Sequence, residues 1–329
     1  MNPLDLLRPG IRTLRHYSID ETSSRVKMDA NESPFDPPEE IRQEISEELR
    51  RIHFNRYPDP GAVTLKKRIS EYLQVEPEHL MLGNGSDELI GYLITAFTGR
   101  NNGVLFPVPT FSMYGIIARA QGQTPMEVPL DSQFQIDPGV FLHSVRKHTP
   151  QIVFLASPNN PTGNGFAEET VLRILEESQA IVVVDEAYID FSSHPGFMKY
   201  LQTAPNLVIL RTLSKIGMAA LRIGILVSSR EITGELEKVR LPYNINTFSQ
   251  AAASALLSHP GVLKKQIRMI TEERERLFGS MSGITGIQTY PSQANFILFR
   301  TQGAEELYRS LLKAGILVRN LDQPGPLQG

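Results

Sequence analysis

Two ionisable side chains follow apolar runs that are short enough to be buried strands. Asp185 comes directly after residues 181–184, and Lys215 comes five residues after the run at 207–210. In open α/β sheets ligands bind at the carboxyl ends of strands, where a lysine can meet a phosphorylated small molecule. A carboxylate in such a poorly solvated place needs a cation, such as a protonated ring nitrogen, or several hydrogen-bond donors. Taken singly, each has an ordinary alternative: a solvated loop lysine and a structural ion pair.

A glycine-rich turn, GNGSD at 83–87, connects a short apolar segment to a predicted helix. Glycines let a backbone approach an anion, and free N–H groups at a helix start can bind it. The turn is not a dinucleotide-binding fingerprint, because Glu88 stands where the third glycine would be, and no P-loop lysine follows. An ordinary glycine turn explains this segment equally well when it is taken alone.

Two further loops after predicted strands carry side chains that suit a ligand. The prolines of SPNNPTG at 157–163 make a rigid loop that holds the amide of Asn160 in place. The loop PVPTFSMY at 107–114 offers Phe111 as a flat apolar surface for a ring. Together, five strand ends supply phosphate donors, a stacking ring, an amide, a carboxylate and an amine. This inventory matches a pyridoxal 5′-phosphate (PLP) site.

The sequence favours a PLP site over a metal site or the active site of a serine hydrolase. The seven histidines show no metal-ligand spacing, since His143 and His148 are five residues apart, and we predict no metal site. There is no cysteine and no G-x-S-x-G motif, so thiolate ligands, cysteine nucleophiles and a nucleophile elbow are absent from the sequence.

Strands and helices alternate through the first two thirds of the chain. Their apolar runs are continuous rather than alternating, which favours a mostly parallel sheet covered on both faces. After about Pro242 the pattern becomes that of a smaller α+β domain. The segments predicted there are helices at 247–258, 260–281 and 304–314 and strands at 294–300 and 316–318. An earlier helix is predicted to begin after Asp36 as its capping residue.

Composition limits the classes of partner. The 329 residues are 41% hydrophobic and 21% charged, with a net charge of −3, which gives no electrostatic case for nucleic acid or a membrane surface. The N-terminus has no apolar core of a signal peptide, and no apolar run reaches the length of a membrane span. We therefore expect a cytoplasmic protein that binds small molecules.

Several motifs together resemble the fold type I, aspartate-aminotransferase-like PLP enzymes, and within them the histidinol-phosphate aminotransferase family. They extend along almost the whole chain: NESP at 31–34, NRYP at 55–58, GNGSDE at 83–88, SPNNPTG at 157–163, VVDEAYIDF at 183–191, RTLSK at 211–215 and LRIG at 221–224. The resemblance implies a three-layer, mostly parallel α/β domain with a smaller α+β domain. It divides the chain into an N-terminal arm (1–30), a large PLP-binding domain (31–245) and a small domain (246–329).

The resemblance also implies a role for each site residue. Lys215 would bond the cofactor and move the proton, Asp185 would pair with the pyridine nitrogen, and Tyr188 and Asn160 would bind the ring oxygen. Phe111 would stack on the ring. The phosphate would be held by Gly85, Ser86, Asp87, Thr212, Ser214, Arg222 and, from the partner subunit of a homodimer, Tyr57. Tyr17, Asn31 and Arg319 match positions that contact the substrate.

The implied reaction is transamination between L-histidinol phosphate and 2-oxoglutarate, giving imidazole-acetol phosphate and L-glutamate. Two features depart from the family pattern: the spacing from Lys215 to Arg222 is one residue shorter, and a strand with a second arginine and a final helix usually follow the last segment seen here. The small domain is therefore expected to be shortened. Three alternatives stay open: threonine-phosphate decarboxylase, an aromatic or other aminotransferase, and a PLP-binding protein without turnover.

Overall fold

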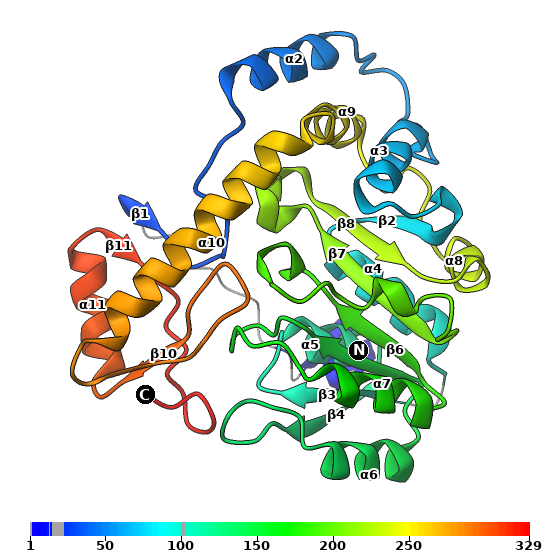
Figure 1. The fold of residues 1–329 in the computed structure, drawn as a ribbon. Coiled ribbons are helices and arrows are strands. Elements are labelled where there is room, and N and C mark those ends of the chain that lie inside the picture. The colour runs from blue at the N-terminus through cyan, green and yellow to red at the C-terminus, as the bar shows by residue number, and fades with distance from the viewer. Residues whose placement is uncertain (1, 13, 15–22, 100–102) are drawn as a thin grey trace.

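A seven-stranded sheet forms the centre of the molecule in the computed structural model, which describes residues 2–12, 14, 23–99 and 103–329 (Figure 1). Its strand order is β2-β8-β7-β6-β5-β3-β4. The strands are β2 (Leu80–Asn84), β3 (Gly103–Val108), β4 (Thr124–Pro129), β5 (Ile152–Ala156), β6 (Ile181–Asp185), β7 (Leu207–Thr212) and β8 (Ile223–Val227). Strand β8 is antiparallel to both of its neighbours, and the other pairs are parallel.

Helices cover both faces of this sheet, so the strands are apolar on both sides. Successive side chains of β6 alternate between two cores: Val182 and Val184 pack into one and Val183 into the other. The first core contains side chains of α3 (Val63–Leu73), α6 (Pro138–His148), α7 (Glu168–Glu177) and α9 (Thr247–Leu257). The second contains side chains of α4 (Ser86–Phe97), α5 (Met113–Ala120) and α8 (Arg230–Leu236). The predicted three-layer α/β fold is confirmed.

A long helix, α10 (Pro260–Ser282), runs from the end of α9 to the C-terminal elements (Figure 1). Those elements are β9 (Ile287–Thr289), antiparallel to β10 (Phe299–Thr301), then α11 (Ala304–Lys313) and β11 (Ile316–Leu317). Near the other end of the chain, β1 (Val26–Lys27) pairs in parallel with β11, and α2 (Glu39–Arg50) packs against α9. The domain division given above stays a prediction.

Short helices complete the described chain: α1 (Pro9–Arg12) and the 3-10 helices η1 (Pro3–Leu6), η2 (Pro77–His79), η3 (Ile189–Phe191), η4 (Met198–Tyr200), η5 (Ser214–Ile216) and η6 (Ala219–Leu221). None of the described helices is both long and apolar enough to cross a membrane.

Three local predictions need correction. The edge strand β4 was not anticipated, because its sequence TPMEVP contains two prolines and is partly exposed. Strand β10 is shorter than 294–300, because only residues 299–301 have a partner in β9. Helix α2 is preceded by Pro38, with no capping side-chain hydrogen bond, so Asp36 is not its cap.

We predict that Gly224→Ala destabilises the fold at the strand end that carries the glycine-rich turn. An added Cβ at Gly224 would lie 2.4 Å from the carbonyl carbon of Gly85 and 2.5 Å from the nitrogen of Ser86. These are backbone atoms, so the turn must move, and we expect the free energy of unfolding in urea to fall by about 1–3 kcal/mol. The control is Gly234→Ala on α8, where no atom lies within 4 Å and helix propensity favours alanine. Equal stability of the two variants would contradict the close approach.

Candidate active site

Two adjacent acids at the end of β6 face opposite sides of the sheet. Glu186 is buried and accepts two hydrogen bonds from Arg211 on β7, at 2.9 and 2.7 Å, and the N–H of Phe197 also donates to it. Asp185 instead faces the core formed with α4 and α5. The period of two along a strand therefore separates one acid that has its own cation from one that does not.

Asp185 is 4% exposed and is held by two donors. The hydroxyl of Tyr114 donates to Oδ2 at 2.7 Å, and the N–H of Ala187 donates to Oδ1 at 3.0 Å. Within the described part of the chain, no lysine or arginine forms an ion pair with it. Burial raises the pKa of Asp185 to about 6, although both hydrogen bonds act to lower it. A buried carboxylate without a cation is thus available for a positively charged partner.

Lys215 lies in η5, three residues after β7 ends. Its Nζ donates to the carbonyl oxygen of Ala30 at 3.2 Å and lies 5.6 Å from the centre of the Tyr188 ring. Burial lowers the pKa of Lys215, and the nearby Arg222 acts in the same direction. A larger share of the amine is therefore neutral than in an exposed lysine, and the neutral amine is the nucleophilic and basic form.

Tyr188 brings segments that are far apart in sequence to this amine. Its hydroxyl accepts hydrogen bonds from the side-chain amides of Asn31 at 3.1 Å and Asn160 at 3.2 Å. The ring of Phe296 meets the Tyr188 ring edge-on at 5.2 Å. Asn295, between β9 and β10, donates to the carbonyl oxygen of Asn31 at 3.0 Å, which connects the C-terminal segment to the site.

The start of α4 lies beside Arg222 at this edge. Gly85 precedes the helix at a φ of 79°, with no side chain hydrogen-bonded as a cap, and a Cβ there would come within 2.2 Å of Nη2 of Arg222. Arg222 pairs with Asp87 at 3.3 Å, and Oδ1 of Asp87 is buried without a hydrogen-bond partner. The hydroxyl of Thr212 donates to the carbonyl oxygen of Ile223 at 3.1 Å and so fixes the turn that precedes Lys215.

The structure thus brings together most of the predicted residues. Lys215 lies within electrostatic range of Asp87, Asp185 and Arg222. Phe111 reaches the site through Tyr114, on which it packs edge-on at 5.6 Å. Ser86 begins α4, and the hydroxyl oxygens of Ser214 and Thr212 lie 2.9 Å apart.

The structure does not bring Tyr57 into this cluster. Tyr57 is 80% exposed and stacks on Tyr243, with ring centres 4.6 Å apart. Arg319 is exposed beyond β11. Tyr17 lies outside the described residues.

The sequence analysis missed Tyr114, Asn295 and Phe296. A signal for Tyr114 was present, because it follows Phe111 by three residues and one helical turn returns both to the same edge. Asn295 and Phe296 could not be placed from local pattern, since their contacts join segments more than 100 residues apart.

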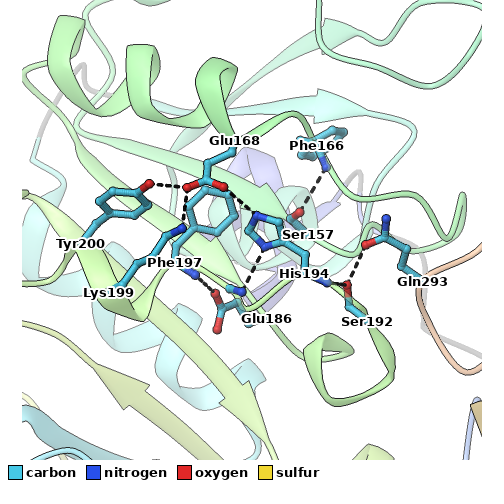
Figure 2. A network of polar contacts seen from close by, with 11 residues as sticks. Ser157, Phe166, Glu168, Glu186, Ser192, His194, Phe197, Lys199, Tyr200 and Gln293 are labelled. Carbon is cyan, nitrogen blue, oxygen red and sulfur yellow. Dashed lines mark hydrogen bonds and ion pairs between the residues drawn. The ribbon is translucent and has the colours of Figure 1, made fainter.

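A network of polar contacts connects the segment 192–200 to the start of α7 (Figure 2). Glu168 at the start of α7 accepts hydrogen bonds from Tyr200 and His194 and pairs with Lys199 at 2.7 Å. These partners, Lys199 first, lower the pKa of Glu168 to about 2. The Ser192 hydroxyl donates to the Gln293 side chain at 2.6 Å, which connects this loop to the C-terminal unit.

A groove of about 820 Å³ lies beside α10 and is separate from the cluster around Lys215. Asp190, Arg211 and Tyr72 line it. Their charges and polar atoms already have partners in the protein, since Arg211 pairs with Glu186 and Tyr72 donates to Asp190 at 3.2 Å. We therefore take the edge that carries Lys215, rather than this groove, as the candidate active site.

Comparison with known proteins agrees with this geometry. Residues 23–327 match the family described as "Aminotransferase class I and II". Among curated relatives, the histidinol-phosphate aminotransferase of Caldanaerobacter subterraneus subsp. tengcongensis is 40% identical over 326 residues, covering 99% of this chain and 92% of the relative. Histidinol-phosphate aminotransferase 2 of Nitrosococcus oceani is 43% identical over 324 residues, covering 98% and 90%.

Solved structures give the same fold. The histidinol-phosphate aminotransferase of Sinorhizobium meliloti, in complex with pyridoxal-5′-phosphate, superposes with a TM-score of 0.86 at 24% identity, covering 95% of this chain and 89% of that one. The enzyme of Clostridium acetobutylicum has a TM-score of 0.80 at 28% identity, covering 89% and 88%. The family match over residues 23–327 and the near full-length relatives show that the chain belongs to the class I and II aminotransferase family.

Proposed function

We propose that this chain is a PLP-dependent aminotransferase of histidine biosynthesis that acts in the cytoplasm on L-histidinol phosphate and 2-oxoglutarate. The products would be imidazole-acetol phosphate and L-glutamate. The observation that carries the proposal is that a partly buried lysine, Lys215, and a buried carboxylate without an ion-pair partner among the described residues, Asp185, follow the neighbouring strands β7 and β6 at the same edge of the sheet. The substrate assignment is supported by the near full-length identity to relatives named histidinol-phosphate aminotransferase.

The residues at this edge fit PLP. The phosphate is a dianion, and α4 offers a helix start without a capping side chain, next to Arg222. A pyridine nitrogen carries a positive charge when it is protonated. Asp185 is a buried carboxylate without a positively charged ion-pair partner in the described structure, so it suits this nitrogen. The amine of Lys215 lies on the strand end between these groups in sheet order. When bound, PLP supplies an electron sink for the bond to the α-carbon of an amine substrate.

The residues of the chain would bind and orient the cofactor and would move a proton of the substrate. Asp185 would hold the ring nitrogen protonated by charge pairing, and Asn160 and Tyr188 would bind the oxygen on the ring. Lys215, held over the Tyr188 ring, would act as the base and acid for the proton on the substrate carbon. Gly85, Ser86, Asp87, Thr212, Ser214 and Arg222 would form the phosphate end.

The substrate end must accept a phosphate from one substrate and a carboxylate from the other. We assign this role to Asn31, Arg319 and Tyr17. Arginine suits both anions, because its planar guanidinium donates two parallel hydrogen bonds to either group.

A cluster of exposed aromatic side chains supports a homodimer. Phe54 is 85% exposed and packs on Phe248, and Tyr57, three residues later, is 80% exposed and stacks on Tyr243. Exposed apolar patches of this kind mark interaction sites, and aromatic residues are enriched at interface centres. We propose that a second copy of the chain covers this face and that Tyr57 reaches the phosphate site of the partner subunit.

Replacing Lys215 with alanine should reduce transamination by at least about a thousandfold, because it removes the only amine placed for bonding and proton transfer at this edge in the described structure. The fold should remain, and the absorbance of added PLP should stay that of the free cofactor. Lys199→Ala, which removes a half-exposed lysine paired with Glu168, is the control and should keep turnover. Turnover retained by Lys215→Ala would refute the assignment.

Replacing Asp185 with asparagine should stabilise the ligand-free protein while weakening its hold on PLP. The folded pKa of Asp185, about 6, lies above its ordinary value near 4, so ionisation of this group costs stability. The cost is absent below about pH 4 and complete above about pH 6, where it amounts to on the order of 3 kcal/mol. Urea unfolding should therefore favour Asp185→Asn at pH 8, with the difference closing toward pH 4. A wild type that is the more stable at pH 8 would contradict the buried, unpaired carboxylate.

Two substitutions at Tyr57 separate its two proposed roles. Tyr57→Glu places a charge on the aromatic face and should shift sedimentation from dimer to monomer. Tyr57→Phe keeps the ring stacked on Tyr243 and should leave the dimer intact, while PLP affinity falls by about five- to tenfold through loss of one hydrogen bond to phosphate. A Tyr57→Glu protein that sediments as the wild type does would show that this face is not the interface.

A further inference from the structure

Tyr114 on α5 is completely buried and touches two proposed parts of the cofactor site. Its hydroxyl donates to Oδ2 of Asp185 at 2.7 Å, and its ring meets Phe111 edge-on at 5.6 Å. A third contact fixes the ring itself, which stacks on Phe154 of β5 with centres 4.6 Å apart and planes 5° apart. One rigid side chain therefore connects the stacking surface to the carboxylate.

The hydrogen bond leaves Asp185 able to bind another group. An ionised carboxylate has about four acceptor positions, and Tyr114 and Ala187 occupy one on each oxygen. Burial and the neighbouring Asp185 charge keep the pKa of the Tyr114 phenol well above its ordinary value, so the hydroxyl remains a donor throughout the neutral range.

We propose that Tyr114 is a positioning residue of the transamination reaction, because its hydrogen bond holds Asp185 ionised and oriented while its ring supports Phe111. This inference rests on the proposed function. Tyr114 itself touches neither substrate nor cofactor in this account. Its effect reaches the ring nitrogen through Asp185 and the ring face through Phe111.

Several charged or titratable groups face Asp185 from the surrounding elements. Tyr114 comes from α5, Asp87 from the start of α4, Glu186 from the next position on the chain and Lys215 from the turn after β7. The charges of Asp87 and Glu186 act with burial to raise the pKa of Asp185, whereas the Tyr114 hydrogen bond is the largest influence that lowers it. Removing the hydroxyl should therefore move this pKa upward.

The test is Tyr114→Phe in the full chain, with PLP affinity measured by cofactor absorbance from pH 5 to 9 and kcat/KM measured over the same range. Phenylalanine keeps the stack on Phe154 and the contact with Phe111 but cannot donate. We expect the acid limb of both profiles to move up by about one pH unit, as for the loss of one hydrogen bond to a charged group. Affinity should be about tenfold weaker at pH 5 and about threefold weaker at pH 6.5, and at pH 9 it should match the wild type within about twofold.

Tyr72→Phe is the matched control, because the Tyr72 hydroxyl also donates to a carboxylate, that of the half-buried Asp190 at 3.2 Å, on the other face of the sheet. Its profiles should be those of the wild type. A second variant carries 3-fluorotyrosine at position 114, which keeps the side chain's shape and donates more strongly. It should move the acid limb down, which makes the inference testable even if Tyr114→Phe does not fold.

An unchanged acid limb in either Tyr114 variant would overturn the inference, and so would an equal loss at every pH, which is the result of a packing defect alone. In both cases a wild type that binds PLP and transaminates leaves the proposed function standing. A wild type that neither binds PLP nor transaminates overturns the proposed function, and the inference with it.

Discussion

The site depends on one buried carboxylate that the protein leaves without a cation. Asp185 and Glu186 are adjacent, both almost fully buried, and differ in their partners: Arg211 pairs with Glu186, whereas Asp185 receives only hydrogen bonds. Burying a charge without a counter-ion is costly, and that cost falls when a cationic ligand arrives. A protonated pyridine nitrogen is such a ligand, so in our proposal the cost of burying Asp185 would be recovered as binding energy when PLP binds.

The sheet explains how these groups meet. Parallel strands bring their carboxyl ends to one edge, and the two-residue period of β6 directs Asp185 toward α5 and Glu186 toward the other core. The same edge receives the start of α4 and the turn after β7, whose conformation is fixed by Thr212. Asn31 and Phe296 lie outside the sheet and both contact Tyr188, so the cluster is complete only when distant segments of the chain are folded together.

Much of this could be predicted from sequence, because strands buried on both faces are continuous apolar runs and their ends carry polar residues. The predicted runs 181–184 and 207–210 lie in strands β6 and β7, and the residues after β5, β6 and β7 do lie along one edge. The edge strand β4 and the limits of β10 could not be predicted, since exposed or unpaired segments lack that pattern. The hydrogen bond from Tyr114 to Asp185 could not be predicted either, because it depends on how α5 packs on the sheet.

The most direct test of the central claim is an absorbance spectrum of the protein with PLP, before and after L-histidinol phosphate is added without any keto acid. Our account predicts that the band of the lysine-bound cofactor disappears and the band of pyridoxamine phosphate grows, which is half of the transamination reaction. A lysine-bound band that does not convert would contradict the substrate, and threonine phosphate would then be tried. A cofactor whose spectrum stays that of free PLP would contradict the role of Lys215 and the account as a whole.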